Sequence, residues 1–98
     1  MIVSEITIKN LADYLKLDFE NLTEEETAEL STFLSSAKAF ILEYTGLSLE
    51  EIDSHETFVI AVYVLVQDMY DNRSYYVEKN NLNQVVAHIL NMHSVNLL

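Results

Sequence analysis

The three histidines are the first candidates for metal or acid–base chemistry in this chain. His88 and His93 lie five residues apart, which places them on different faces of a helix, whereas helical zinc pairs usually follow an i, i+4 spacing. The chain contains no cysteine, so thiolate zinc sites, disulfides and cysteine nucleophiles are all excluded. The histidine spacing therefore predicts no metal site.

A group of acidic residues is the second candidate, as a calcium site. It consists of Asp18, Glu20, Glu24, Glu25, Glu26 and Glu29. A calcium loop turns around a glycine, and this stretch has none. Thr23 and Glu26 instead have the spacing of a capping box, and Glu24 and Glu25 suit the positive end of a helix dipole. We interpret the group as the solvated start of a helix.

Catalytic patterns are missing from the rest of the sequence. No spacing selects a pair of carboxylates for acid–base work, and a single glycine, Gly46, does not build a phosphate-binding loop. Nothing resembles the combination of nucleophile, base and positioning group that catalysis requires. The sequence therefore predicts a protein that binds other subunits, with no cofactor and no enzymatic activity.

The only arginine, Arg73, follows Asp68 and Asp71 at the end of an apolar segment. Its planar guanidinium suits a bidentate contact with a carboxylate. The simpler interpretation is a surface ion pair with Asp68 or Asp71, worth under about 1 kcal/mol. The alternative is a clamp between two subunits, and the sequence leaves both open.

Six tyrosines and no tryptophan make tyrosine the main aromatic candidate for contacts. Tyrosine is favoured at interfaces because it buries a large area while keeping a polar tip. Tyr44 and Tyr63 fit a core position more simply. Tyr75 and Tyr76 occur in the polar segment 71–81, which we predict to be a loop, and they are the better contact candidates.

Two helices are predicted in the first half of the chain. Thr7 is a suitable N-cap for a short helix whose apolar residues Ile8, Leu11, Ala12 and Leu15 share one face. The second helix runs from about residue 24 to about residue 45, because apolar residues follow the helical period without a break. Gly46, the sole glycine, is placed to close it in a left-handed conformation.

Further helical signals follow in the second half. Ser48 and Glu51 cap a single turn, Asp53 or Ser54 caps a helix over residues 54–70, and Asn81 caps a last helix. The 54–70 helix is apolar almost all round, so it must be covered on every side, for which a neighbouring subunit is a reasonable candidate. We predict one all-α domain over residues 1–98, a small bundle of about four helices, two longer and two short.

The formal net charge of −11 argues against nucleic-acid binding, since the five basic residues are scattered along the chain. The longest apolar run, residues 58–66, is far shorter than the roughly 20 residues of a membrane span. Residues 1–10 lack the basic start and apolar stretch of a secretory signal. We expect a soluble protein that is made in the cytosol and has no membrane partner.

Four features in a fixed order carry a family resemblance. They are the opening segment 6–18 (ITIKNLADYLKLD), the Tyr-Thr-Gly ending of segment 41–46, the Tyr-x-Asn-Arg ending of segment 68–73, and a short last helix. This layout resembles the small head–tail connector (adaptor) proteins of tailed bacteriophages and prophages, over nearly the whole chain. The chain departs from the family before and after its last helix, where Asn80, Asn81 and His93 replace the usual glycine or proline and the basic residue.

The resemblance implies a homo-oligomeric ring, such as a dodecamer, at the head–tail junction of the virion. The ring would dock on the portal protein, bind a head-completion or tail protein, and pass DNA without specific binding. Implied subunit or portal contacts are Tyr70, Asn72, Arg73, Tyr75 and Tyr76. Tyr44, Thr45 and Gly46 form a structural turn, and Glu24, Glu25 and Glu26 are candidates to face the DNA channel, where repulsion keeps DNA from sticking.

An acidic helical inhibitor or DNA mimic from a mobile element is the alternative function. Such a protein would space its carboxylates like phosphates on one face. It would bind a DNA-binding protein as a monomer or dimer, and it would form no ring.

Overall fold

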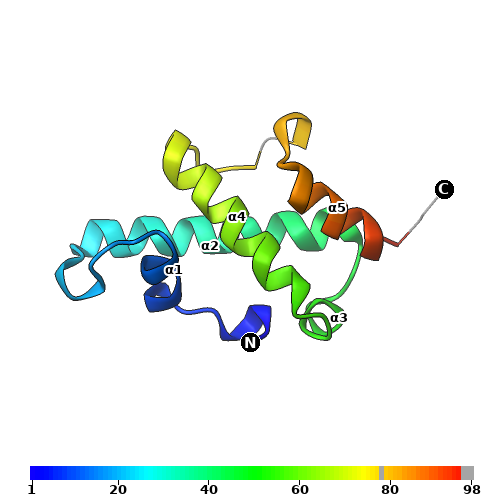
Figure 1. Cartoon of the computed structure of the whole chain (residues 1–98), viewed down its shortest axis with the longest axis horizontal. Helices are drawn as coiled ribbons and strands as arrows, with labels where there is room; N and C mark the ends of the chain where they lie inside the picture. The colour runs from blue at the N-terminus through cyan, green and yellow to red at the C-terminus, as the bar shows by residue number, and fades with distance from the viewer. Residues whose placement is uncertain (78, 96–98) are drawn as a thin grey trace.

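The computed structural model describes residues 1–77 and 79–95. The described chain is all-α and measures 47 × 27 × 18 Å. Figure 1 shows the long helix α2 (Glu24–Thr45) along the longest axis, with α4 (Thr57–Asn72) crossing it. Helix α1 (Ile8–Tyr14) packs beside one half of α2, and α5 (Gln84–His93) packs on α4 and α2. The short helix α3 (Leu49–Asp53) contacts the 3-10 turn Val3–Glu5.

Helix α2 has the bounds that the sequence predicts. The Thr23 hydroxyl accepts a hydrogen bond from the Glu26 amide at 3.1 Å, and a Glu26 carboxylate oxygen accepts one from the Thr23 amide at 3.0 Å. At the other end Gly46 adopts φ 73°, and its amide donates to the Leu42 carbonyl. The capping box and the left-handed glycine therefore both form as predicted.

Two shorter helices also begin at their predicted caps. The Thr7 hydroxyl accepts from the Asn10 amide before α1, and Asn10 closes a capping box by accepting from the Thr7 amide. Ser48 and Glu51 make the same reciprocal pair before α3. Each of these caps joins residues within one turn, so its residues can be recognised from their spacing in the sequence.

The predicted start of α4 is wrong by about one turn. The helix begins at Thr57 after Glu56, which provides no side-chain cap, and it continues to Asn72, beyond the predicted end at residue 70. Neither predicted cap is available: Asp53 accepts hydrogen bonds from the amide and hydroxyl of Ser4, and Ser54 ends α3. A contact 49 residues away in sequence has taken the capping side chain.

The predicted cap of the last helix is also wrong. Asn81 lies in a 3-10 turn, Lys79–Asn81, and the helix starts two residues later with Asn83 as its N-cap. The Asn83 side-chain oxygen accepts from the Val85 amide at 2.8 Å. Both asparagines are good caps, and the 3-10 turn decides which of them precedes the helix.

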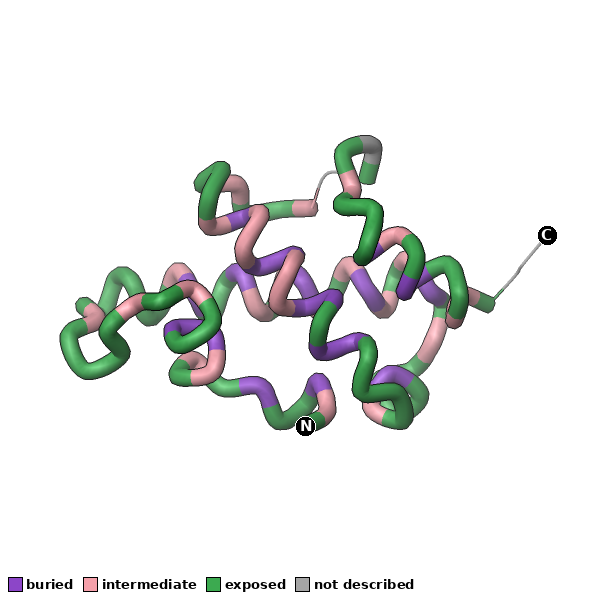
Figure 2. The backbone as a smooth tube through the Cα atoms, viewed as in Figure 1, coloured by how far each residue is buried: buried purple, intermediate pink, exposed green. Residues whose placement is uncertain are grey.

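The core is continuous along the crossing of α4 with α2 (Figure 2). On α4 it includes Phe58, Ala61, Val62, Leu65, Val66 and Met69, all at most 2% exposed. Tyr63 and Val64 are half-buried, whereas Ile60 is 50% exposed. The chain's own helices therefore cover most of the apolar surface of α4, which is more than the sequence analysis expected of so small a domain.

Candidate interaction surface at the end of helix α4

Helix α4 ends in a left-handed residue that is not glycine. Arg73 has φ 50°, and the Ser74 amide donates to the Met69 carbonyl at 3.0 Å. The Asn72 side-chain amide donates to the Asp68 carbonyl, one turn back in the helix. A left-handed conformation costs a residue with a Cβ roughly 1–2 kcal/mol, so other contacts must hold Arg73 in place.

Those contacts come from α2 and from the helix itself. The Arg73 guanidinium forms an ion pair with Glu29 on α2, and it lies 4.4 Å from the centre of the Tyr70 ring. The predicted pairing with Asp68 or Asp71 is therefore wrong. Arg73 leaves the helical path at the left-handed turn, and Asp71 accepts a hydrogen bond from Gln67 instead. The clamp between two subunits stays a prediction.

Tyr75 joins the same cluster. Its ring stacks on Phe33 of α2 at 5.5 Å, its hydroxyl donates to Glu29 at 2.9 Å, and its carbonyl accepts from the Ser36 hydroxyl. The hydrogen bond to the Glu29 carboxylate raises the pKa of the Tyr75 phenol, because losing the proton would bring two negative charges together. We call Glu29, Phe33, Tyr70, Arg73 and Tyr75 the α2–α4 anchor.

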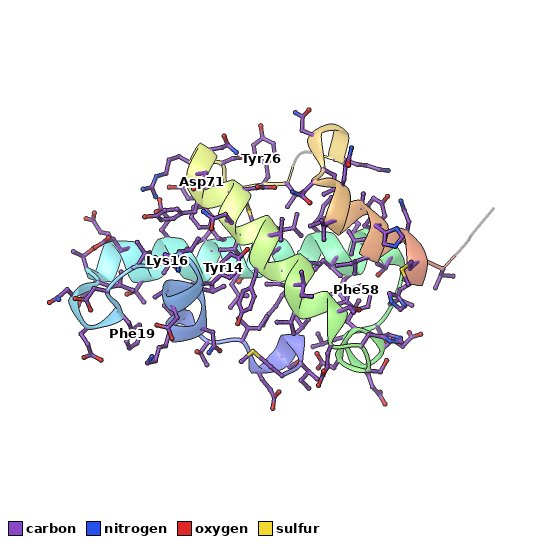
Figure 3. All side chains as sticks on the ribbon, in the orientation of Figure 1. Tyr14, Lys16, Phe19, Phe58, Asp71 and Tyr76 are labelled. Carbon is purple, nitrogen blue, oxygen red and sulfur yellow. The ribbon has the colours of Figure 1, made fainter. Side chains whose placement is uncertain are left out.

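One aromatic residue of the anchor and one beside it remain open to solvent. Tyr75 is 53% exposed and Tyr76 is 65% exposed. Figure 3 shows Tyr76 and Asp71 on the same side of the molecule, around the end of α4. Of the five predicted contact residues, the anchor brings together Tyr70, Arg73 and Tyr75, whereas Asn72 and Tyr76 lie outside it.

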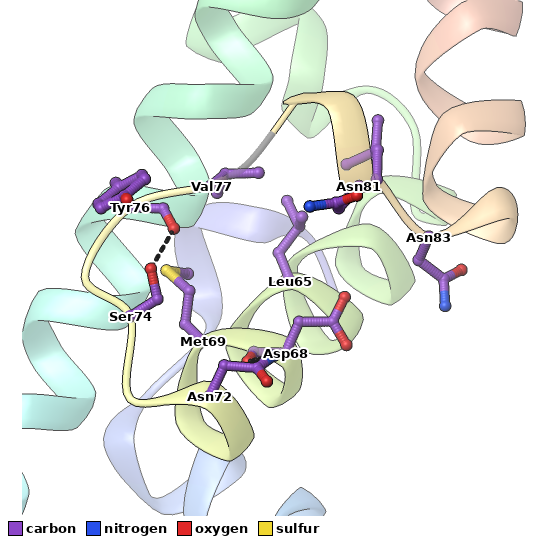
Figure 4. Close-up of a pocket in the computed structure, with 10 residues that line it drawn as sticks. Leu65, Asp68, Met69, Asn72, Ser74, Tyr76, Val77, Asn81 and Asn83 are labelled. Atoms are coloured by element: carbon purple, nitrogen blue, oxygen red, sulfur yellow. Dashed lines mark hydrogen bonds between the residues drawn. The ribbon is translucent and has the colours of Figure 1, made fainter.

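A pocket of about 690 Å³ lies between α4, the segment that follows it and the start of α5 (Figure 4). Its lining residues are Leu65, Asp68, Met69, Asn72, Ser74, Tyr76, Val77, Asn81, Leu82 and Asn83. Partial burial raises the pKa of the Asp68 carboxyl, and the negative charge of Asp71 adds to the effect. The predicted contacts Asn72 and Tyr76 are part of this pocket, which sequence spacing alone does not reveal.

The other predicted turn, Tyr44 to Gly46, ties α2 to α5. Thr45 is buried and donates its hydroxyl hydrogen to the Ile41 carbonyl at 2.7 Å. Its own carbonyl accepts from the Val95 amide, and the Tyr44 hydroxyl donates to Asn91 at 2.7 Å. The Tyr-Thr-Gly segment therefore connects the end of α2 to α5 and to Val95, which follows α5.

The acidic candidates Glu24, Glu25 and Glu26 are exposed in the first turn of α2. They differ in their roles, because only Glu26 closes the capping box. Hydrogen bonds from the amide and hydroxyl of Thr23 lower the pKa of Glu26. Glu24 and Glu25 are the two that remain free of this structural role.

A histidine pair that the sequence analysis missed lies at the opposite end of α5. The rings of His55 and His93 are 4.3 Å apart, and both contact Phe58. Spacing along one helix could not reveal this pair, since the two residues belong to different elements. Within residues 1–77 and 79–95, no group of three or more histidine, aspartate or glutamate side chains is placed to hold a metal ion.

Comparisons of the chain with protein-family models, with curated proteins and with solved structures found no match. Among the described helices, none is both long and apolar enough to cross a membrane.

Proposed function

We propose that this protein is a structural subunit of a phage or prophage head–tail connector ring, which docks on the portal and extends the DNA channel toward the tail. The proposal depends on one observation, that segments of the family resemblance coincide with the ends of the long helices. Two of the resembling segments, Tyr-Thr-Gly and Tyr-x-Asn-Arg, each end a long helix in a left-handed residue, Gly46 and Arg73. These segments therefore set the shape of the subunit.

The α2–α4 anchor supports a role in contacts between proteins. Glu29 holds both Arg73 and Tyr75, so the segment that carries the exposed Tyr75 and Tyr76 is fixed before any partner arrives. Binding then costs less side-chain and loop entropy than it would for a free loop. Tyrosine and arginine are also the residue types enriched at protein interfaces.

The charge of the subunit fits a channel that DNA passes through. With a net charge of −11 per chain, a ring repels the phosphate backbone, provided that some carboxylates face its centre. Glu24 and Glu25 are exposed and have no capping role, so they are the best candidates for that position. Replacing them by lysine is expected to give the assembled ring a salt-dependent affinity for DNA.

Mass measurement by light scattering on a sizing column, over a concentration series, tests the proposal, together with negative-stain images of the largest species. We expect rings with an open centre, either from the protein alone or after addition of portal protein. Tyr76→Ala is expected to weaken assembly. Met92→Ala is the matched control, because Met92 on α5 has the same 65% exposure.

A strict monomer or compact dimer that does not bind portal protein would contradict the connector proposal. If that species instead bound a DNA-binding protein in competition with DNA, the DNA-mimic function would take its place.

A further inference from the structure

The pocket at the end of α4 combines an apolar wall with one charge. Leu65, Met69, Val77 and Leu82 supply the apolar side chains. Asp68 is the only charged residue among the described residues that line it. Asp68 makes no ion pair within the described part of the chain. The pocket thus offers an unneutralised carboxylate beside an apolar surface.

Asparagine side chains add polar groups around Asp68. The Asn72 amide nitrogen is committed to the Asp68 carbonyl, so its oxygen is left as an acceptor. The Asn83 oxygen caps α5, and Asn81 lines the same opening (Figure 4). A ligand with several hydrogen-bond donors and a positive charge matches this set better than an anion does.

We propose that this pocket binds an arginine side chain, carried on a short apolar segment of a partner protein. The aliphatic stem of arginine packs on Val77 and Leu82, which are partly exposed, while the guanidinium meets the Asp68 carboxylate and the Asn72 oxygen. A volume of about 690 Å³ exceeds what one side chain fills, which leaves room for an apolar neighbour of the arginine.

The composition of the chain identifies the partner as a different protein. Arg73 is the only arginine, and Glu29 and Tyr70 already hold it. A second copy could offer it only by breaking its own α2–α4 anchor. A basic partner also complements the net charge of −11. The inference depends on the pocket alone, so it remains valid if the connector proposal fails.

An array of pentapeptides tests the proposal, with arginine or its neutral isostere citrulline at the centre and varied apolar residues on both sides. We expect the full chain to prefer arginine over citrulline peptides by about tenfold at physiological salt. Asp68→Asn is expected to remove this preference. Asp71→Asn is the matched control, since it removes the same charge from an exposed residue of α4 that does not line the pocket.

Equal binding of the two peptide sets would overturn the proposal. Equal loss of preference in Asp68→Asn and Asp71→Asn would also overturn it, because the attraction would then come from the overall charge. A self-association of the protein that depends on Asp68 would identify a second copy as the occupant and would refute the partner of different sequence.

Nuclear magnetic resonance of the unmodified protein gives a test that needs no variant. Butylguanidinium is the probe, and we expect saturable shifts of the amide signals of Asn81, Leu82 and Asn83. Shifts confined to other residues would refute the site. Peptides that bind no more tightly than butylguanidinium would point to a free small molecule and would refute a protein partner.

Discussion

Glu29 and Arg73 are 44 residues apart in the sequence, and they form an ion pair that fixes the end of α4 against α2. The same carboxylate accepts the hydroxyl hydrogen of Tyr75 through its other oxygen. Glu29 is 22% exposed as a side chain, which makes it the best shielded partner of any ion pair in the described chain. One acidic residue of the long helix therefore positions both the left-handed turn and the aromatic segment that follows it.

The coupling between Glu29 and Arg73 is the first prediction. In a double-mutant cycle with Glu29→Gln and Arg73→Gln, measured by urea unfolding, we expect a coupling free energy of about 1 kcal/mol. The exposed pair Lys9–Asp13 is the control, since it has the same i, i+4 spacing as pairs worth about 0.3–0.5 kcal/mol. Equal coupling in the two pairs would show that the anchor gains nothing from the partial burial of Glu29.

The left-handed end of α2 gives the second prediction. Gly46→Ala is expected to lower the free energy of unfolding by about 1 kcal/mol, because alanine is strained at φ 73°. Crowding adds little, since an added Cβ would lie 3.6 Å from Val95 Cβ, an ordinary contact. Ala39→Gly on the exposed face of α2 is the opposite exchange, and we expect it also to destabilise, by about 0.5–1 kcal/mol. A neutral Gly46→Ala would contradict the left-handed assignment.

The third prediction concerns the capping box of α2. Thr23→Ala is expected to cost about 1 kcal/mol in chemical denaturation. Glu26→Ala should destabilise the fold more than Glu24→Ala or Glu25→Ala, because only Glu26 accepts the Thr23 amide hydrogen. Glu24 and Glu25 are thus the built-in controls, exposed in the same helical turn.

The pKa of Glu26 also predicts how the effect of a Glu26→Gln substitution on stability changes with pH. The pKa of Glu26 is lowered in the folded state, so its contribution to stability is fully present above its ordinary unfolded value. That contribution is lost as the pH falls through the lowered pKa. The stability difference between the protein and Glu26→Gln should therefore shrink in acid, and a difference that is constant with pH would contradict the capping role.

The fourth prediction concerns Asp68, whose effect on stability changes with pH in the opposite direction to that of Glu26. Its pKa is raised in the folded state by partial burial and by Asp71, so the ionised group opposes folding. The penalty is absent below the unfolded pKa, grows as the pH rises and is complete above the raised pKa. We expect Asp68→Asn to be slightly more stable than the parent protein at neutral pH and equal to it in strong acid, as measured by thermal unfolding. An Asn variant that is less stable at neutral pH would show that Asp68 stabilises the fold.

The sequence determined the local parts of this protein. Three helix starts, at Thr7, Thr23 and Ser48, depend on reciprocal bonds within four residues, and Gly46 ends α2 because it alone adopts the left-handed conformation without strain. Apolar periodicity predicted the all-α class, because it too depends only on residues that are close together in the sequence. These features need only neighbours along the chain, so spacing is enough to find them.

Tertiary structure decided every feature that depends on distant contacts. Helix α4 starts later than predicted, because Asp53 bonds to Ser4. Arg73 pairs with Glu29, although Asp68 and Asp71 are nearer in sequence. Tertiary structure also assembled the pocket around Asp68 and the neighbouring rings of His55 and His93 from separate elements. A polar side chain has several partners of similar energy, and only the packing of the helices determines which of them comes within reach.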